Sequence, residues 1–502
     1  MDYSNPIADT SSIQSPSAPI HSTTYHNQKR LSPSQIVAAM KISVYESFPA
    51  QIFVTLTGGV FLPAFALALG ANNLYIGALA AIPFFANLFQ LVGAYFVENH
   101  FDRKRLCVVS SSLSRVLWAP AIILTLLVFA QSTTIMRGVL LVLLILVYAL
   151  LALSGVAWLS WMMDVVPEGI RGRYYGLRNS VVSIATVLTT FAGGWFLDQQ
   201  HGSRMAFGIL FTVASLAGTI CMILLIKQPA PPKLFLPRHE NFLRLYREPF
   251  QQPNFRRLLR FSLLWQFAFS FASPFFVVYL LTELKVGYAL AAFYTVIHAG
   301  FEFFGMRVWG HISDHTGNKP VITIAAVVYG VLPWIWLLTF KNAFSYYFLI
   351  PLLHIAGGFF WAAYNLCSIN LMFRLAARER NSIYFGAWAA CNGLAACAGS
   401  LLGGALGRWS ALHQVDLLLF SMAGLKIVFL LTGALRFAAL WFLRPIKETP
   451  GLRTRQALEL LRQARNWRML VKENTASPAN LEEEKFWPLF RRKKAARHLP
   501  MT

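Results

Sequence analysis

Twelve apolar runs, most of about 20 residues or more, occupy most of the sequence between residues 44 and 443. A helix of about 20 apolar residues is long enough to cross the hydrocarbon core of a bilayer. We therefore predict an all-α membrane protein with twelve transmembrane helices, six on each side of a polar central segment. The predicted spans are 44–69, 75–98, 106–130, 138–163, 174–198, 205–226, 259–282, 289–313, 320–340, 344–372, 382–407 and 417–443.

Charged residues are few and lie mostly between these runs. The chain of 502 residues is 56% hydrophobic and only 13% charged, whereas soluble domains carry about 25% charged residues. Its formal net charge of +23 raises the question of a nucleic-acid partner. The basic residues, however, lie in short loops and in a C-terminal tail, which is the pattern that orients a membrane protein. We therefore expect no nucleic-acid partner.

The loops alternate in their content of basic residues. Arginine and lysine cluster after the even-numbered spans, whereas the loops after the odd-numbered spans hold only scattered charges. Because basic loops stay in the cytoplasm, this pattern predicts cytoplasmic N- and C-termini. It also favours a location in the inner or plasma membrane.

This topology divides the chain into five parts. Residues 1–40 are rich in Ser, Pro, Thr, Asn and His, and are predicted to be a disordered cytoplasmic tail. Residues 41–227 and 258–444 form the two predicted six-helix bundles, and 228–257 form a cytoplasmic linker between them. Residues 445–502 form a basic tail whose apolar residues recur at helical spacing, which indicates an amphipathic helix on the inner leaflet. A solvated tail is an equal alternative.

The loop after the eighth span carries the pattern Gly-x-x-x-Asp-x-x-Gly-x-Lys, formed by Gly310, Asp314, Gly317 and Lys319. A small residue lets two membrane helices approach closely. An acid at the end of a helix can face the positive N-terminus of another helix. A weaker copy of the pattern lies at residues 94–104, after the second span. One signature at matching places in two halves of a membrane chain indicates a duplicated transporter.

These features resemble the major facilitator superfamily, whose loop signature follows the second and eighth spans. The second copy is complete in this chain, whereas the first has Glu98 as its acid and Phe101 where the family prefers glycine. Residues 164–176 and 378–386 also look like the family's repeated Pro-Glu-x-x-Arg-Gly segment. The resemblance covers about 44–443, and it implies two six-helix bundles, a central site and alternating access.

The geometry of the family implies a gate on the cytoplasmic side. Asp314 should lie near the start of the fifth span, where Arg171 and Arg173 occur, and Glu98 should lie near the basic start of the eleventh span. Each acid would meet a positive helix end and an arginine when the cytoplasmic side is closed. A role in topology and packing alone is the alternative. The predicted gate residues are Gly310, Asp314, Gly317, Lys319, Glu98, Arg103, Asp164, Arg171, Arg173, Arg378 and Arg380.

Ionisable residues inside a span are costly, so each is a functional candidate. His298 and Glu302 are four residues apart in the eighth span and therefore share a helix face. A carboxyl group in a dry site keeps its proton more readily, which suits proton coupling. The alternative is a structural pair satisfied by Arg307 or by a backbone carbonyl. Arg115 is the preferred contact for an anion.

The resemblance also implies that spans one, four, seven and ten line the cargo cavity. Aromatic and amide side chains in these spans are candidate cargo contacts, although each alone is more often a packing residue. They are Tyr148, Trp158, Trp161, Trp265, Gln266, His354, Trp361, Tyr364 and Asn365. Glu46, Asp164 and Asp198 lie near predicted span ends, where charge costs less, and rank lower.

We therefore expect a monomeric secondary transporter of a small organic solute, with alternating access and proton coupling. No Gly-x-x-x-x-Gly-Lys-Ser/Thr loop occurs, which argues against a primary pump. The spans lack the spacing of a nucleophile with its base or of metal ligands, which argues against an enzyme. No cofactor or metal is expected, and the five cysteines read as small buried apolar residues. The alternative is a membrane sensor or assembly factor that keeps the fold and works through its tails.

Overall fold

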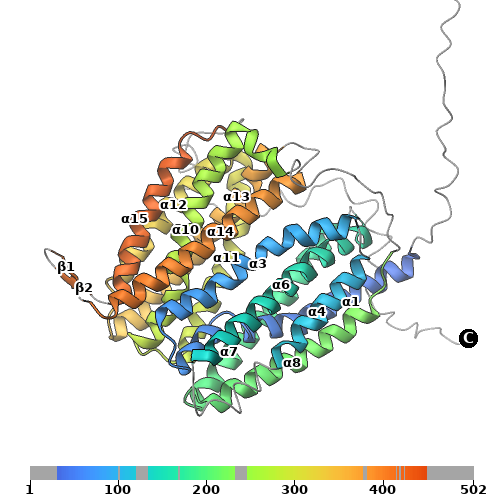
Figure 1. The fold of residues 1–502 in the computed structure, drawn as a ribbon. Helices are drawn as coiled ribbons and strands as arrows, with labels where there is room; N and C mark the ends of the chain where they lie inside the picture. Colours follow the sequence, from blue (N-terminus) through green and yellow to red (C-terminus); the bar gives the residue numbers. More distant parts are fainter. Residues whose placement is uncertain are drawn as a thin grey trace, which may run out of the picture.

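Long helices in two groups make up the computed structural model (Figure 1). It describes residues 31–99, 102–119, 134–167, 170–231, 246–376, 381–413, 415–417, 420–422 and 424–448. The first group comprises α1 (Pro33–Leu56), α2 (Phe61–Ala68), α3 (Asn73–Asn99), α4 (Arg103–Val116), α6 (Thr134–Val165), α7 (Arg171–Gln199) and α8 (Arg204–Lys227). A short 3-10 turn, η2 (Pro249–Gln251), precedes the second group. That group comprises α10 (Pro253–Thr282), α11 (Tyr288–Thr316), α12 (Asn318–Trp336), α13 (Ile350–Leu375) with a π-helical turn η3 (Ser345–Leu349) before it, α14 (Asn381–Ser410) and α15 (Leu425–Leu443).

The length and surface of these helices suit a lipid bilayer. Within the described residues, 11 helical segments are long and apolar enough to cross a membrane, and α1 and α2 together count as one of them. α4 is described over 14 residues, at the beginning of the predicted third span. Large apolar side chains such as Ile209, Leu216 and Ile220 are exposed on α8, as expected of a surface that faces lipid. The predicted all-α membrane fold with two bundles is confirmed, while the orientation of its termini stays a prediction.

The first helix begins earlier than the sequence analysis predicted. Residues 33–40, which were assigned to the disordered tail, belong to α1. Ser32 caps the helix, since its hydroxyl accepts from the Gln35 amide (3.3 Å) and its own amide donates to the Gln35 side chain (2.9 Å). This reciprocal pair is a capping box, and Pro33 at the first helical position fits a helix start. Hydropathy alone overlooks these signals because the cap consists of the polar residues Ser32 and Gln35 together with Pro33.

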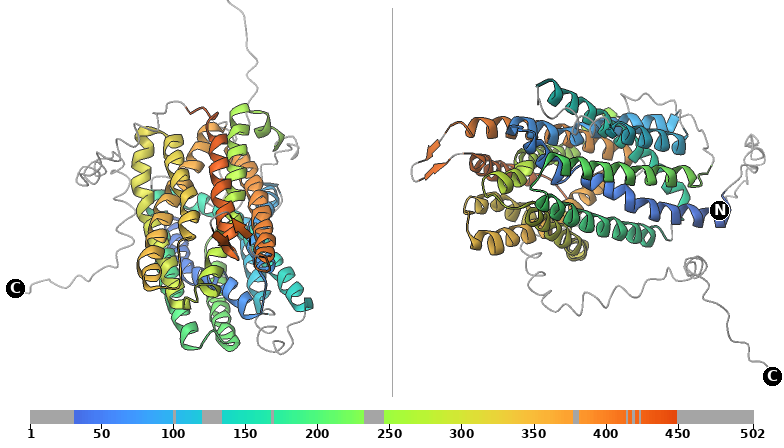
Figure 2. Two further views of the ribbon diagram at one scale, coloured as in Figure 1. Left: turned by 90° about the vertical axis from the view of Figure 1, so that its left-hand side faces the viewer. Right: turned by 90° about the horizontal axis from the view of Figure 1, so that it is seen from below.

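The last helix begins later than predicted, at Leu425 rather than at residue 417. Two short antiparallel strands, β1 (Val415–Leu417) and β2 (Phe420–Met422), take up the start of the predicted span. Gly424 follows with a φ of 67°, a conformation that glycine adopts readily, and it separates the hairpin from the helix. The hairpin projects beyond the helix ends (Figure 1 and the right-hand view of Figure 2).

The structure also bears on the predicted start of the second bundle, on the linker and on the C-terminal tail. The second bundle begins at Pro253, five residues before the predicted boundary at 258, and the proline again occupies the first helical position. Residues 232–245 of the linker lie outside the described residues. So do residues 449–502, which include the predicted amphipathic helix.

The most extensive contacts between the bundles are those of α3 with α14 and of α7 with α11, and α10 also contacts α2 and α3. Figure 1 shows α3 and α14 side by side along much of their length. Gly77 of α3 and Gly404 of α14 face each other, since a Cβ placed on Gly77 would lie 3.0 Å from the Gly404 Cα. Small residues at this point let the two backbones approach closely. The α3–α14 contact therefore depends on glycine at both positions.

We predict that Gly404→Leu destabilises the protein by about 1–3 kcal/mol, because the new side chain meets the backbone of α3. The measurement is the thermal unfolding midpoint of the purified protein in detergent. Gly155→Leu in α6 is the control, since a Cβ on Gly155 has nothing within 4 Å. Equal midpoints for the two variants would show that close approach at Gly404 is not required.

Candidate functional site

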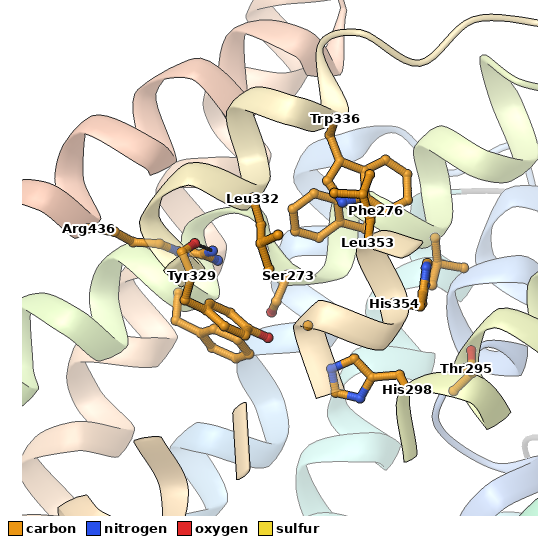
Figure 3. A pocket seen from close by; sticks show the side chains of 13 residues that line it. Ser273, Phe276, Thr295, His298, Tyr329, Leu332, Trp336, Leu353, His354 and Arg436 are labelled. Carbon is orange, nitrogen blue, oxygen red and sulfur yellow. Dashed lines mark hydrogen bonds between the residues drawn. The ribbon is translucent and has the colours of Figure 1, made fainter. Parts of the chain in front are cut away.

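A cavity of about 230 Å³ lies within the second bundle, among α10, α11, α12, α13 and α15 (Figure 3). Its walls are mainly aromatic and aliphatic, and a few polar side chains reach it from different helices. Drug-sized ligands occupy pockets of roughly 300–1,000 Å³, so this cavity suits a smaller molecule. The residues that line it are Phe269, Ser273, Phe276, Val277, Thr295, His298, Tyr329, Leu332, Trp336, Leu353, His354, Gly357 and Arg436.

Two histidines from neighbouring helices meet at one side of this cavity. His298 of α11 and His354 of α13 have ring centroids 6.5 Å apart. The Nδ1 of His354 lies 3.0 Å from the Ile350 carbonyl oxygen, and because a carbonyl only accepts, this nitrogen is the donor. Gly357 leaves room for the other ring, because a Cβ there would lie 3.3 Å from the His298 Cδ2. The structure thus pairs two residues that the sequence analysis listed for different roles.

Arg436 enters the opposite side of the cavity from the middle of α15. Its side chain is buried, with a relative exposure of 1% for the residue. Nη1 donates to the Tyr329 carbonyl at 2.8 Å, and the guanidinium lies 4.9 Å from the Tyr329 ring centroid and 5.6 Å from that of Phe269. Nε is buried without a hydrogen-bond partner. Among the described residues, no carboxylate lies within 4 Å of this guanidinium.

Glu302 lies one turn beyond His298 on α11, but it does not line the cavity. Its side chain is half-buried and makes no hydrogen bond or ion pair within the described part of the chain. The Arg307 guanidinium, its proposed structural partner, instead lies 5.6 Å from the Phe303 ring centroid. Glu302 is therefore a carboxyl group in a membrane helix without a described counter-ion.

The predicted cargo aromatics of the second bundle form a stack beside the cavity. Trp265 stacks on Tyr364 with ring centroids 4.9 Å apart, and Trp361 stacks on Phe269 at 4.4 Å. Trp265 and Tyr364 are almost fully buried and do not line the cavity, whereas Phe269 does. Of the predicted cargo contacts, His354 alone is among the cavity's lining residues. Gln266 and Asn365 are partly exposed elsewhere on α10 and α13.

The predicted cargo contacts of the first bundle lie in the core of that bundle or beside the break between α1 and α2. Trp161 is buried in that core. Trp158 lies under Arg178, with the guanidinium carbon 4.1 Å from its ring centroid. A Cβ on Gly58 would lie 3.5 Å from the Tyr148 hydroxyl, which places Tyr148 beside the break between α1 and α2.

A buried polar cluster joins four helices of the first bundle. Glu46 of α1 accepts a hydrogen bond from the Cys221 thiol of α8 at 2.9 Å, and Arg115 of α4 donates to the same sulfur at 2.8 Å. The guanidinium of Arg178, from α7, lies 3.7 Å from the second Glu46 oxygen. Arg115 also donates to the Ser111 carbonyl and hydroxyl. The preferred anion contact, Arg115, therefore already takes part in a network within the protein.

This cluster was not predicted from the sequence, because Glu46 was expected to lie near a span end. α1 begins at Pro33 and ends at Leu56, so Glu46 lies in the middle of the helix. Cys221 was predicted to be a small buried apolar residue. The signal that could have found the cluster is the presence of an acid inside a span, which requires a partner.

At one end of the bundles, Asp198 links α7 to α11. Its carboxylate accepts hydrogen bonds from the Tyr288 amide (2.7 Å) and the Ala289 amide (2.8 Å), in the first turn of α11. A carboxylate at this position binds the unpaired amides and the positive end of the helix. Asn73 adds a second link there, since its side chain donates to the Gly407 carbonyl at 2.8 Å. Both contacts join one bundle to the other.

At the opposite end, the predicted pairs with Asp314 are absent from this conformation. Asp314 is exposed, and no ion pair joins it to Arg171 or Arg173 in the described residues. Arg171 donates instead to the Met163 carbonyl at 2.8 Å and to the Val166 carbonyl at 3.2 Å. The Glu98 side chain and the arginines at 378 and 380 lie outside the described residues, so that half of the predicted gate is not tested.

The remaining gate residues make contacts inside single bundles. Arg103 forms an ion pair with Asp164. Lys319 donates to the carbonyls of Arg444 (2.8 Å) and Ile446 (2.7 Å). Gly317 has a φ of 89° and ends α11, and a Cβ on Gly310 would lie 3.5 Å from the Leu366 side chain.

Glu448 belongs to the same corner and was not predicted. Its carboxylate accepts from the Asn318 amide (2.9 Å) and the Lys319 amide (2.7 Å) at the start of α12, and from Arg374 at 3.0 Å. These contacts join the segment after α15 to the start of α12 and to the end of α13 within the second bundle.

The helix order, the two bundles and the loop signature together define a membrane transporter fold. The family profile of the Major Facilitator Superfamily matches residues 47–400 and 267–495. The chain belongs to the major facilitator superfamily. No curated protein sequence matches the chain.

Solved structures of transporters share this fold. A mutant of the nucleoside transporter NupG is 12% identical with a TM-score of 0.65, covering 82% of this chain and 100% of its own. A D-xylose–proton symporter is 14% identical with a TM-score of 0.63, covering 83% and 99%. The xylose transporter XylE from E. coli, in an inward-open conformation, is 13% identical with a TM-score of 0.61, covering 85% and 99%. At these identities the likeness shows the fold and leaves the cargo open.

We expect Glu46→Gln to lower the stability of the purified protein by about 3–5 kcal/mol, because it leaves buried guanidinium groups without their carboxylate. Thermal unfolding measures the effect. Asp164→Asn is the control, since its pair with Arg103 is partly exposed, and it should cost about 1 kcal/mol or less. A Glu46→Gln protein as stable as the Asp164→Asn protein would contradict a role for the buried cluster.

Proposed function

We propose that this protein is a secondary active transporter that moves a small organic solute by alternating access. The observation that carries the proposal is the asymmetry between the two ends of the bundles. At the Asp198 end, a carboxylate of one bundle binds the helix start of the other at 2.7 and 2.8 Å. At the Asp314 end, the corresponding acid is exposed and unpaired with Arg171 and Arg173. Such an arrangement fits a state that is closed at one side and open at the other.

The space around the Asp314 end supports the same proposal. A Cβ placed on Gly172 or Gly176 of α7, near this end, meets nothing within 4 Å. At the other end of the same helix pair, a Cβ on Gly194 would lie 2.7 Å from the Ala292 side chain. The α7 glycines of this helix pair are therefore closely packed near Asp198 and unobstructed near Asp314. The basic loops assign the Asp314 end to the cytoplasm, so the proposed state is inward-facing.

In the opposite state, which is open at the Asp198 end and closed at the Asp314 end, these contacts would be reversed. Asp314 would approach the start of α7 and bind Arg171 or Arg173, while Asp198 would release the first turn of α11. Each acid would then bind a helix N-terminus in one state only, which is the differential interaction that a two-state equilibrium requires.

We predict that Asp198→Asn shifts the protein toward the state that is open at the Asp198 end, because it weakens the charge-assisted bonds to α11. Spin labels at Gln200 and Lys285 report this end, and labels at Gly172 and His315 report the other. Cys391 and Cys397 are replaced by alanine, which leaves the buried cysteines in place. The expected result is a longer Gln200–Lys285 distance together with a shorter Gly172–His315 distance.

The matched control is Glu283→Gln at the same end. Glu283 also binds the start of a helix, since it accepts from the Leu425 amide at 3.0 Å, but α10 and α15 belong to one bundle. Its loss should leave both label distances unchanged. Asp314→Asn should favour the state already open at its end. If Asp198→Asn leaves both distances as they are, the proposed latch and the alternating mechanism built on it are wrong.

We also propose proton coupling through the His298–Glu302 face of α11. The support is chemical, since Glu302 lacks a described counter-ion and His298 lines the cavity. Neutralising such a carboxyl group removes an unpaired charge from the membrane interior and biases the equilibrium between the two states.

If the transporter is proton-coupled, the ratio of the two conformational states, measured from the label distances, should differ between about pH 5 and about pH 8. The Glu302→Gln variant should lose this pH response, because glutamine stays neutral throughout. Glu283→Gln should keep it. A pH response of the same size in Glu302→Gln would remove Glu302 from the mechanism.

A further inference from the structure

We infer that the cavity of the second bundle binds a small organic monoanion, a carboxylate on an aromatic or aliphatic body, with Arg436 as its counter-ion. This inference rests on the proposed transport function and names the class of its cargo. It is carried by the charge of Arg436, by the shape and lining of the cavity, and by the contrast with the first bundle.

Arg436 carries a buried positive charge that the described residues do not neutralise. Its protein partners are a neutral carbonyl and two aromatic faces, and its Nε has no hydrogen-bond partner. A buried charge without an opposite charge is strongly unfavourable. In the first bundle the comparable guanidinium of Arg178 has Glu46 at 3.7 Å. In the second bundle no described acidic side chain lies beside Arg436, so a bound anionic ligand can supply the negative charge.

The geometry of arginine selects the kind of anion. A guanidinium presents parallel N–H groups that match the two oxygens of a carboxylate. Figure 3 shows the Arg436 side chain entering the cavity beside Tyr329. One fixed positive charge balances one negative charge, so a monocarboxylate is compensated, whereas a dianionic phosphate is not.

The lining of the cavity selects the rest of the molecule. Phe276, Leu332 and Trp336 form apolar walls, and Phe269 and Tyr329 add aromatic surface next to the guanidinium. Burial of an apolar body against these walls is favourable. A volume of about 230 Å³ limits that body to a small one. A sugar-like ligand would need many polar partners, and the polar lining is limited to Ser273, Thr295, Tyr329, His298, His354 and Arg436.

The test uses the full-length protein, purified in detergent, and four organic probes in two matched pairs. Benzoate and hexanoate are the carboxylates, and benzamide and hexanamide are neutral molecules of similar shape. Inorganic phosphate is a fifth probe. Binding is followed by tryptophan fluorescence, because Trp336 lines the cavity, and by the thermal unfolding midpoint, which a ligand of the native state raises.

We expect at least one carboxylate to bind at least about tenfold more tightly than its amide and than phosphate. Arg436→Gln should weaken carboxylate binding at least about tenfold and should remove the preference over the amide. Lys426→Gln is the matched control on the same helix. Lys426 donates to the Leu337 carbonyl at 3.2 Å and does not line the cavity, so its loss should leave binding unchanged.

A second variant keeps the inference testable if Arg436→Gln does not fold. Ser273→Leu fills part of the cavity and does not touch the contacts of Arg436, so it should weaken binding of the organic probes. Three results would overturn the inference. They are equal affinity for carboxylate and amide, carboxylate binding that survives Arg436→Gln, and no carboxylate binding up to about 10 mM, ten times a dissociation constant of about 1 mM.

The failure of this inference differs from the failure of the proposed function. Suppose that in Asp198→Asn the Gln200–Lys285 distance lengthens and the Gly172–His315 distance shortens, but the carboxylates do not bind. The protein then alternates between two states, and its cargo belongs to another class. If carboxylates bind but neither label distance changes, the cavity is an anion site in a protein that does not transport by alternating access.

Discussion

A charge buried among membrane helices needs an opposite charge, and this requirement organises the interior of both bundles. In the first bundle the protein meets it internally. Glu46 lies among Cys221, Arg115 and Arg178, so one carboxylate and a thiol connect helices that are distant in sequence. In the second bundle Arg436 has aromatic rings and a carbonyl around it instead. The two bundles differ in whether a described side chain supplies the counter-ion.

Among the described residues, three carboxylates bind the start of a helix other than their own, and these contacts have two different consequences. Glu448 on α12 and Glu283 on α15 join helices of one bundle. Asp198 on α11 joins the two bundles. The bonds are alike in length, so their effect depends on which bodies they connect. An intrabundle bond stabilises a fixed unit, whereas an interbundle bond contributes to only one conformation of the whole molecule.

The sequence predicted the fold well because the hydropathy pattern and the loop signature are local properties. The apolar runs located the helices, and the errors fell at boundaries. The start of α1 carries a capping box that hydropathy does not detect, and the strands of the β1–β2 hairpin resemble the start of a span. One such boundary error also affected the prediction for Glu46. Because α1 begins at Pro33, Glu46 lies in the middle of the helix and not near its end.

The candidate site was predicted only in part. His298 and His354 were both selected, yet their meeting across α11 and α13 depends on the packing of two helices. Arg436 is visible in the sequence as a charge in a span, but only the positions of its neighbours show that no described carboxylate lies beside it. Asp198 and Gly287 lie at the ends of different spans, and nothing local to either shows that one binds the other's helix. Trp265 and Tyr364 are aromatic in the expected spans but face the core.

The sequence by itself determined that the chain crosses a membrane in two sets of helices, because a helix must be apolar over the whole thickness of the bilayer. It also determined which loops are basic. Only the tertiary structure decided which charges find partners, which end of the bundles is joined, and where a cavity remains. These properties depend on distances between side chains of different helices, and such distances arise only when the helices pack.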